Sequence, residues 1–337
     1  MNISNNLMAP CLLIIAMLVL ILFQSVFFTN GDVIYSESEI KSELTSETTN
    51  SVDFIIYNNI KYKPDRFFIL SVISNISAFL LPAVFYVKLK GTGYSKNLKL
   101  QLPKIKYISL TLFMFVVIIS GSVLINSLMI YFGETAVDSV NMLPAVIYTG
   151  GNPVYDMGVI ISFIFLPAFC EEIFFRSVMS AEYEKYGAFC AVMMTSAAFA
   201  MSHFSFKFFP SYFFAAFVLY ILAKITNSVT LAVILHAGYN FFNIYLWDRL
   251  SGVLNFEQNR TIFIFITAII FILFIYFVLN RLEIIYYNKA YMNEPSPILE
   301  DLPGNSRKSP KIIKLFKSLL SPTFIAAIII FFIYINI

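Results

Sequence analysis

Charged residues are scarce in this chain of 337 residues. Only 13% of the residues are charged, whereas 59% are hydrophobic and 17% are aromatic. A soluble domain has about 25% charged residues, and so few charges could not cover a core of this size in water. The composition therefore argues against soluble, disordered, fibrous and nucleic-acid-binding proteins. It indicates a protein that spans a membrane several times, and we expect this to be the plasma membrane.

Cysteine is also rare, and the three cysteines all lie within apolar stretches: Cys11, Cys170 and Cys190. No oxidising machinery would pair thiols at such positions, so we expect neither disulfides nor a thiolate zinc cluster. The formal net charge of +3 is small, so the placement of the charges is more informative than their sum.

Long apolar runs dominate the sequence instead. A helix needs roughly 20 apolar residues to cross a hydrocarbon core of about 30 Å. The first run has no basic residue before it and no evident cleavage site, so we interpret it as a retained transmembrane helix. We predict an all-α fold, a polytopic transmembrane helical bundle of about eight to nine spans. The candidate spans are 8–28, 67–87, 107–132, 157–182, 188–206, 208–226, 229–247, 261–280 and 319–336.

The distribution of lysine and arginine predicts the orientation of these spans. The 88–106 connection holds six lysines and no acidic residue, so we expect it to be cytoplasmic. If the spans alternate across the membrane from this loop onwards, 16 of the 23 basic residues lie on the cytoplasmic side and 7 on the other. The amino terminus is then cytoplasmic and the carboxyl terminus is external.

The chain divides into four parts. Residues 1–66 comprise the first transmembrane helix and an external polar loop, and 67–149 comprise transmembrane helices with the basic cytoplasmic loop. Residues 150–250 contain the groups suited to chemistry, and 251–337 add carboxyl-terminal transmembrane helices with a cytoplasmic linker. A basic cluster near that linker favours contact with anionic lipid over nucleic acid: Arg307, Lys308, Lys311, Lys314 and Lys317.

An unusual concentration of charge lies in the fourth candidate span. Glu172 and Arg176 are four residues apart and share a helix face, where arginine can hold the carboxylate ionised. Glu171 points about 100° away and lacks that partner. Two carboxylates in unlike environments often separate a structural anion from a group that transfers protons. A solvated ion pair at a helix end is the alternative. Pro167 could kink this helix and free backbone groups beside the pair.

The chain has only two histidines, and both lie in apolar spans. His203 follows Phe199 by one turn, and His236 shares a helix face with Asn240. Glu171 and His203 are each 16 residues from Gly187, so a hairpin turning there would place both on the order of 20–24 Å from the turn. A single histidine in such a helix is more often a packed core group. Two of them favour proton transfer or metal binding.

Three spaced motifs from these spans resemble those of the CPBP family, which comprises type II CAAX prenyl proteases and bacteriocin-processing or immunity proteins, also called Abi proteins. The resemblance covers about residues 150–250. The motifs are Glu171-Glu172-x-x-x-Arg176, Phe199-x-x-x-His203 and His236-x-x-x-Asn240, in that order.

The resemblance implies an intramembrane endopeptidase with a polar cavity inside the helical bundle. The resemblance implies a role for each matching position. Glu171 and His203 would activate a water molecule, and His236 and Asn240 would stabilise the oxyanion. The residues that would support the site are Glu172, Arg176 and Phe199. Glu171, His203 and His236 could also ligate zinc, but a carboxylate and an imidazole sharing a polarised water require no cofactor. We favour this metal-free chemistry. The implied partners are a peptide or membrane-protein substrate and the lipid bilayer, and no nucleic acid.

Two other functions fit parts of the same pattern. A bacteriocin-immunity protein or scaffold could keep the fold without proteolysis, since fold does not determine function. A transporter could use the glutamate and histidines as a proton relay. The transporter is the weaker alternative because the sequence has no evident inverted repeat or pair of broken helices.

Overall fold

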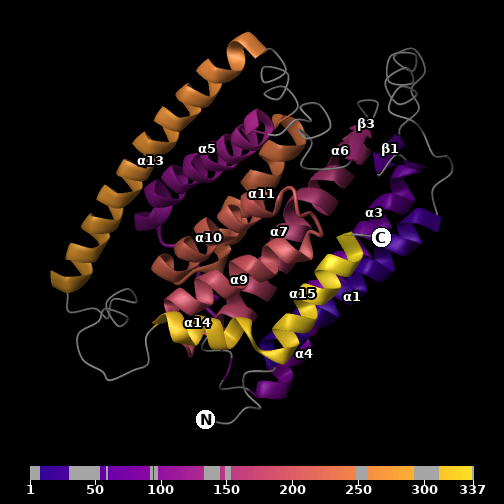
Figure 1. Ribbon diagram of the computed structural model, residues 1–337, viewed down its shortest axis with the longest axis horizontal. Helices are drawn as coiled ribbons and strands as arrows, with labels where there is room; N and C mark the ends of the chain where they lie inside the picture. The colour runs from indigo at the N-terminus through magenta and orange to yellow at the C-terminus, as the bar shows by residue number, and fades with distance from the viewer. Residues whose placement is uncertain are drawn as a thin grey trace.

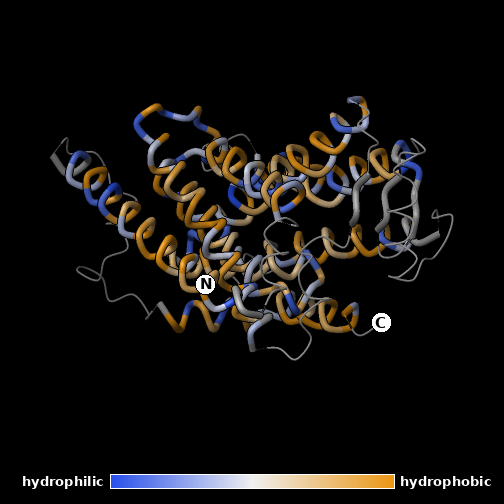
Figure 2. The backbone as a smooth tube through the Cα atoms, turned by 90° about the horizontal axis from the view of Figure 1, so that it is seen from above, coloured by the Kyte–Doolittle hydropathy of each residue, from blue (hydrophilic) through white to orange (hydrophobic). Residues whose placement is uncertain are grey.

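The computed structural model describes residues 8–29, 54–57, 60–91, 94, 98–132, 145–148, 153–247, 257–291 and 311–335. These residues form a bundle of helices with one small sheet (Figure 1). Hydrophobic residues run along most of the helices, and hydrophilic residues gather towards helix ends and turns (Figure 2). The prediction of an all-α polytopic bundle is confirmed.

The number of spans is somewhat lower than predicted. Six helices are long and apolar enough to cross a membrane, and one bent pair at the carboxyl terminus would make a seventh. Two predicted spans are helical but shorter than the length required: α9 (Ala188–Ser202) has 15 residues and α11 (Val229–Tyr245) has 17. Each of the nine predicted runs is nevertheless helical over most of its length in the described part of the chain.

The amino-terminal helices lie along one side of the bundle. They are α1 (Met8–Thr29), α3 (Pro64–Asn75), the π-helical turn η3 (Ile76–Leu80) and α4 (Leu81–Lys90). The α15 helix (Pro322–Ile335) lies beside α1, and the Tyr334 hydroxyl donates a hydrogen bond to the side chain of Gln24. This contact joins the carboxyl-terminal halves of both helices, and Figure 1 shows α1 and α15 running in the same direction.

The fourth span is one long, irregular helix. It consists of α6 (Pro153–Val159), η6 (Ile160–Phe165), α7 (Leu166–Glu172), η7 (Ile173–Met179) and α8 (Ser180–Glu184). Both η segments are π-helical, a form that is rare and is found mainly as bulges at functional sites. Pro167 lies at the start of α7.

Two tight turns bring the following helices back against this span. Gly187, with φ of 105°, ends the turn after α8, because a residue without a Cβ adopts this backbone region without strain. The α9 helix then returns through the bundle, and α10 (Phe209–Thr226) follows. Asn227 takes the left-handed conformation at the end of α10 and leads into α11.

Two helices form the opposite side of the bundle. The first is α5 (Ile108–Phe132), which follows the short 3₁₀ turn η5 (Ile105–Tyr107). The second is α13 (Glu257–Tyr291), which lies along α5 (Figure 1). Gly121 permits close packing here, since a Cβ at that position would come within 2.3 Å of the Phe214 ring of α10. The helix α14 (Lys311–Leu319) precedes α15.

A three-stranded antiparallel sheet was not predicted. The central strand β1 (Phe54–Tyr57) pairs with β2 (Ile60–Tyr62) on one side and with β3 (Ala145–Tyr148) on the other. Sequence analysis had placed 54–57 inside an external polar loop. The rest of the predicted loop, and most of the linker predicted at 290–312, lie outside the described residues.

The basic segments meet at one end of the bundle, around the carboxylate of Glu184. Lys99 and Lys224 both form ion pairs with Glu184, the latter at 3.1 Å, and the Tyr220 hydroxyl donates to it at 3.0 Å. We call these four residues the Glu184 cluster. Burial is the main cause that lowers the pKa of Lys99, and Glu184 opposes this effect. The cluster fastens the predicted cytoplasmic loop to α8 and α10.

Candidate active site

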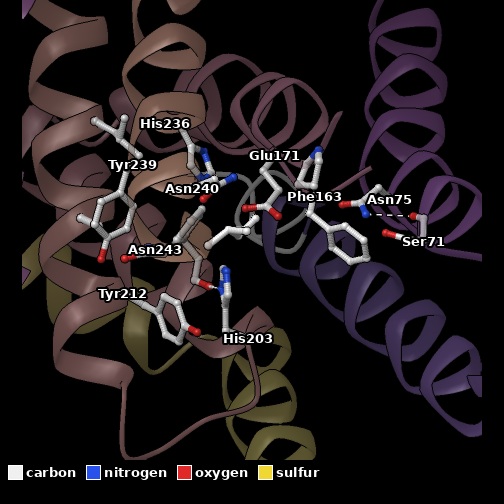
Figure 3. A pocket seen from close by; sticks show the side chains of 15 residues that line it. Ser71, Asn75, Phe163, Glu171, His203, Tyr212, His236, Tyr239, Asn240 and Asn243 are labelled. Carbon is white, nitrogen blue, oxygen red and sulfur yellow. Dashed lines mark hydrogen bonds between the residues drawn. The ribbon is translucent and has the colours of Figure 1, made fainter. Parts of the chain in front are cut away.

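A cavity of about 210 Å³ lies inside the bundle. At roughly 30 Å³ per molecule of liquid water, it has room for several waters. Figure 3 shows Glu171, His203, His236 and Asn240 around a common space. The complete lining comes from α3, η6, α7, α9, α10, α11 and the turn after α9: Ser71, Asn75, Phe163, Pro167, Glu171, Phe199, His203, Tyr212, Ala215, Leu219, His236, Tyr239, Asn240, Asn243 and Ile244.

Glu171 is the acidic residue of this cavity. It comes from the last turn of α7 and is only 7% exposed. Its Oε2 atom has no hydrogen-bond partner in the described part of the chain. A buried carboxylate oxygen without a protein donor is costly unless water or a ligand supplies one. This carboxylate is therefore positioned to bind a water molecule or a polar ligand.

Glu172 contacts two cations or potential cations instead of the cavity. Its Oε2 lies 3.0 Å from Nε of Arg176, and its Oε1 lies 2.8 Å from Nδ1 of His236. All three side chains are buried. Because a carboxylate accepts hydrogen bonds, Nδ1 of His236 must be the donor, and this contact fixes the orientation of the imidazole. The predicted pairing of Glu172 with Arg176 is present, but its bond to His236 was not predicted.

His203 is held by its own helix end and by an aromatic ring. Its Nδ1 lies 2.9 Å from the carbonyl oxygen of Phe199. A carbonyl can only accept, so Nδ1 carries the proton and Nε2 of the neutral ring keeps a lone pair. The Tyr212 ring stacks on the imidazole with ring centroids 4.1 Å apart. Nε2 is thereby available to a water molecule in the cavity.

Phe199 lies between the charged and imidazole groups. The Arg176 guanidinium is 4.6 Å from the centroid of its ring, within the range of a cation–π interaction. The same ring lies 4.7 Å from His203 and 5.6 Å from His236, measured between centroids. The side chain thus spaces the two imidazoles, while its backbone carbonyl orients one of them.

The irregular fourth span supplies backbone acceptors at the cavity wall. In the π-helical register of η6, the carbonyl of Ser162 would accept from residue 167, which is a proline and has no N–H. That carbonyl instead accepts from the Ser71 hydroxyl at 3.3 Å. The carbonyl of Ile164 accepts from Nδ2 of Asn240 at 3.4 Å. The break before Pro167 therefore links α3 and α11 to the fourth span.

Comparison with protein families connects this geometry to a known group. Residues 153–242 match the family model described as type II CAAX prenyl endopeptidase Rce1-like. This segment is similar to that family. The resemblance to the CPBP family is confirmed, and the match supports an endopeptidase of the CAAX protease kind at the level of the family. Neither a curated protein nor a solved structure matches the chain significantly.

The Rce1-like segment contains all seven residues singled out from the sequence, and the structure brings them together. Glu171, His203, His236, Asn240 and Phe199 line the cavity. Glu172 and Arg176 lie directly behind it, through their contacts with His236 and Phe199. The segment extends from α6 to α11, whereas α3 contributes to the cavity from outside it.

The geometry of the Rce1-like site does not favour a metal centre. No three side chains of His, Cys, Asp or Glu among the described residues are arranged to hold a metal ion. In particular, Glu171, His203 and His236 do not form such a group. We therefore derive no chemical step through a metal.

Several cavity residues were not identified from the sequence. Tyr212, Tyr239 and Asn243 come from α10 and α11, and Ser71 and Asn75 come from α3. Tyrosines are frequent in this chain, so nothing in the sequence distinguished Tyr212 from those at lipid-facing positions. The spacing of Ser71 and Asn75, one turn apart within an apolar run, was a signal that could have been used.

Proposed function

We propose that this protein is an intramembrane endopeptidase that hydrolyses a peptide bond with a water molecule activated by Glu171 and His203. The proposal rests chiefly on one observation. A buried carboxylate with an unsatisfied oxygen and an imidazole with a free Nε2 line the same cavity, which is large enough for water. The family of residues 153–242 supports the same activity.

In the proposed reaction, water donates one hydrogen bond to the Glu171 carboxylate and one to Nε2 of His203. Glu171 takes a proton as the water oxygen attacks the carbonyl carbon of the substrate, and the carbonyl oxygen becomes an oxyanion. When the C–N bond breaks, the proton passes to the leaving amine. The products are a carboxylic acid and an amine, and the Glu171 carboxylate carries the proton between the two steps.

His236 and Asn240 are the donors proposed for the oxyanion. Donation from Nε2 of His236 requires the imidazolium form, and the neighbouring Glu172 carboxylate supplies its counter-charge. Asn240 uses one N–H on the Ile164 carbonyl and keeps the other for the cavity. Arg176 forms an ion pair with the other oxygen of Glu172.

The substrate is proposed to be a peptide or a protein segment at the membrane. We also propose that the end containing the Glu184 cluster faces the cytoplasm and that the membrane is the plasma membrane. The amino-terminal end of α1 then lies on the cytoplasmic side. The clustering of Lys99, Lys224 and α14 at that end supports this orientation.

Purified protein in detergent tests the activity directly. Candidate peptides are incubated in H₂¹⁸O, and mass spectrometry identifies the fragments and the ¹⁸O in the new carboxylate. We expect Glu171→Gln and His203→Ala to lower the cleavage rate by roughly 10²–10⁴-fold. Glu184→Gln, which removes a half-buried carboxylate at one end of the bundle, is the matched control and should retain activity. A chelator should leave the wild-type rate unchanged.

Two outcomes would contradict the proposal. Equal cleavage by wild type and by both site variants would show that these side chains perform no chemistry. Folded wild type without activity on a broad peptide set and on membrane extracts would favour the non-proteolytic scaffold instead. Loss of activity with the chelator and recovery with zinc would retain the protease but reject its metal-free mechanism.

A further inference from the structure

The helix α14 differs from every neighbouring element in the arrangement of its polar and apolar residues. It lies across the end of the bundle, whereas α15 rises beside α1 (Figure 1), and the two helices meet at 61°. Its Ser318 hydroxyl lies 3.4 Å from the Cys190 thiol in the first turn of α9. This contact places α14 at the same end of the bundle as the turn that follows Glu184.

Three sides of α14 have different surroundings. Ser318 is 8% exposed and faces the bundle with the half-buried Leu315. A second side has large apolar side chains that are open to the surroundings, Ile312 at 60% and Phe316 at 58% exposed, and Leu320 in the turn after the helix is 68% exposed. Lys314 and Lys317 lie on the third side, one turn apart.

Such an arrangement is typical of a helix that lies in the plane of a membrane interface. Exposed isoleucine, phenylalanine and leucine would be unfavourable in water, whereas they gain free energy within the boundary of the acyl chains. Lysines beside them can extend their ammonium groups to the lipid headgroups. The apolar side also continues into α15, whose 14 residues are almost all apolar.

We propose that α14 is an interfacial helix that binds anionic lipid headgroups through Lys314 and Lys317. Its apolar side rests on the acyl chains of the same leaflet, and its inner side holds α9. The partner is a leaflet containing anionic lipid, because two cations flank an exposed apolar surface. The interaction is independent of the proposed protease chemistry, since neither lysine lines the cavity.

Fluorescence quenching tests this proposal in the intact protein. Phe316→Trp places a reporter on the apolar side, and the parent protein, whose single Trp247 is buried, supplies the background. The protein is placed in nanodiscs of phosphatidylcholine and phosphatidylglycerol, with bromine on the acyl chains of only one lipid at a time. We expect brominated phosphatidylglycerol to quench several-fold more per molecule, because each lysine near the surface attracts anionic lipid.

Two double variants make the test specific. Lys314→Gln with Lys317→Gln should bring the quenching by the two lipids to the same value per molecule. Lys88→Gln with Lys104→Gln removes two exposed lysines from the same end of the bundle and should keep the preference. Equal quenching by both lipids in the reporter protein would reject the anionic partner. Absence of quenching by either lipid would reject the interfacial position and indicate that protein covers this side.

Discussion

Two carboxylates of one continuous helical span, the buried Glu171 and the half-buried Glu184, differ in how many hydrogen-bond and ion-pair partners the protein provides. Glu184 is 21% exposed, yet two lysines and a tyrosine hydroxyl contact it. Glu171 is only 7% exposed, yet one of its oxygens has no partner among the described residues. Water could solvate the first carboxylate more easily than the second. Glu184 therefore has several protein partners although solvent is near, whereas Glu171 lacks a partner for one oxygen where solvent is scarce.

This contrast agrees with the proposal that Glu171 is a reactive carboxylate and Glu184 a structural one. The Glu184 cluster joins α8, α10 and the loop before α5. Both oxygens of its carboxylate contact a donor within the cluster. The Glu171 carboxylate keeps an acceptor for a molecule that enters the cavity. Glu172 resembles Glu184 in having charged partners, because its Oε2 forms an ion pair with Arg176 and its Oε1 accepts a hydrogen bond from His236. The proposal therefore gives Glu171 and Glu172, adjacent residues on one helix, different roles.

The largest expected effect is that the two carboxylates respond in opposite ways to replacement. Replacing Glu184 should lower stability and retain activity, whereas replacing Glu171 should lower activity without lowering stability. Glu184→Gln leaves Lys99 and Lys224 without their anion and should lower the free energy of unfolding by about 2 kcal/mol. Glu171→Gln removes an unsatisfied charge and should leave stability unchanged or increase it. Thermal unfolding in detergent measures both variants. A lower midpoint temperature of unfolding for Glu171→Gln than for Glu184→Gln would contradict this difference between the two carboxylates.

A smaller effect is expected from the ring that stacks on His203. Tyr212→Phe keeps the stacked ring and should keep activity within about threefold, whereas Tyr212→Leu should lower kcat by roughly tenfold with little change in KM. The reason is that Tyr212 positions the imidazole without forming its hydrogen bond to Phe199. Steady-state kinetics on a cleaved peptide checks this. Equal kcat values for the two variants would assign Tyr212 no positioning role.

The smallest effect is expected on the cavity wall outside the Rce1-like segment. Asn75 donates to the Ser71 carbonyl at 2.9 Å, and its amide oxygen lies on the cavity side in Figure 3. This acceptor suits a backbone N–H of the substrate. We expect Asn75→Ala to raise KM by roughly three- to tenfold with kcat unchanged, since a hydrogen bond contributes about 0.5–1.5 kcal/mol. Asn75→Asp keeps the acceptor and should remain closer to wild type. An unchanged KM in Asn75→Ala would argue against this contact.

The sequence predicted the helices well because apolar runs in a membrane have few alternatives to helix. It also predicted the pairing of Glu172 with Arg176, since both lie on one helix at a spacing of four residues. Contacts between helices were harder to predict. The bond from His236 to Glu172 and the stack of Tyr212 on His203 depend on helix rotation, which hydropathy does not determine.

Two further features escaped prediction for physical reasons. The strand β1 is a four-residue apolar patch whose partner β3 lies almost 90 residues away in the sequence. The π-helical turns before and after α7 change the rotation of the fourth span by a fraction of a turn. A spacing rule based on 3.6 residues per turn therefore places Glu171 on the correct element, but it cannot give the direction of the side chain.

The shared carboxylate of Glu172 has a consequence for biogenesis. Its bond to Arg176 lies within one helix and can form as soon as that helix enters the bilayer. Its bond to His236 must wait until α11 has been synthesised, inserted and packed. The newly made chain therefore passes through a stage in which the imidazole is not yet oriented. Because α11 is synthesised after α7, the proposed hydrolysis would begin only when the bundle is assembled.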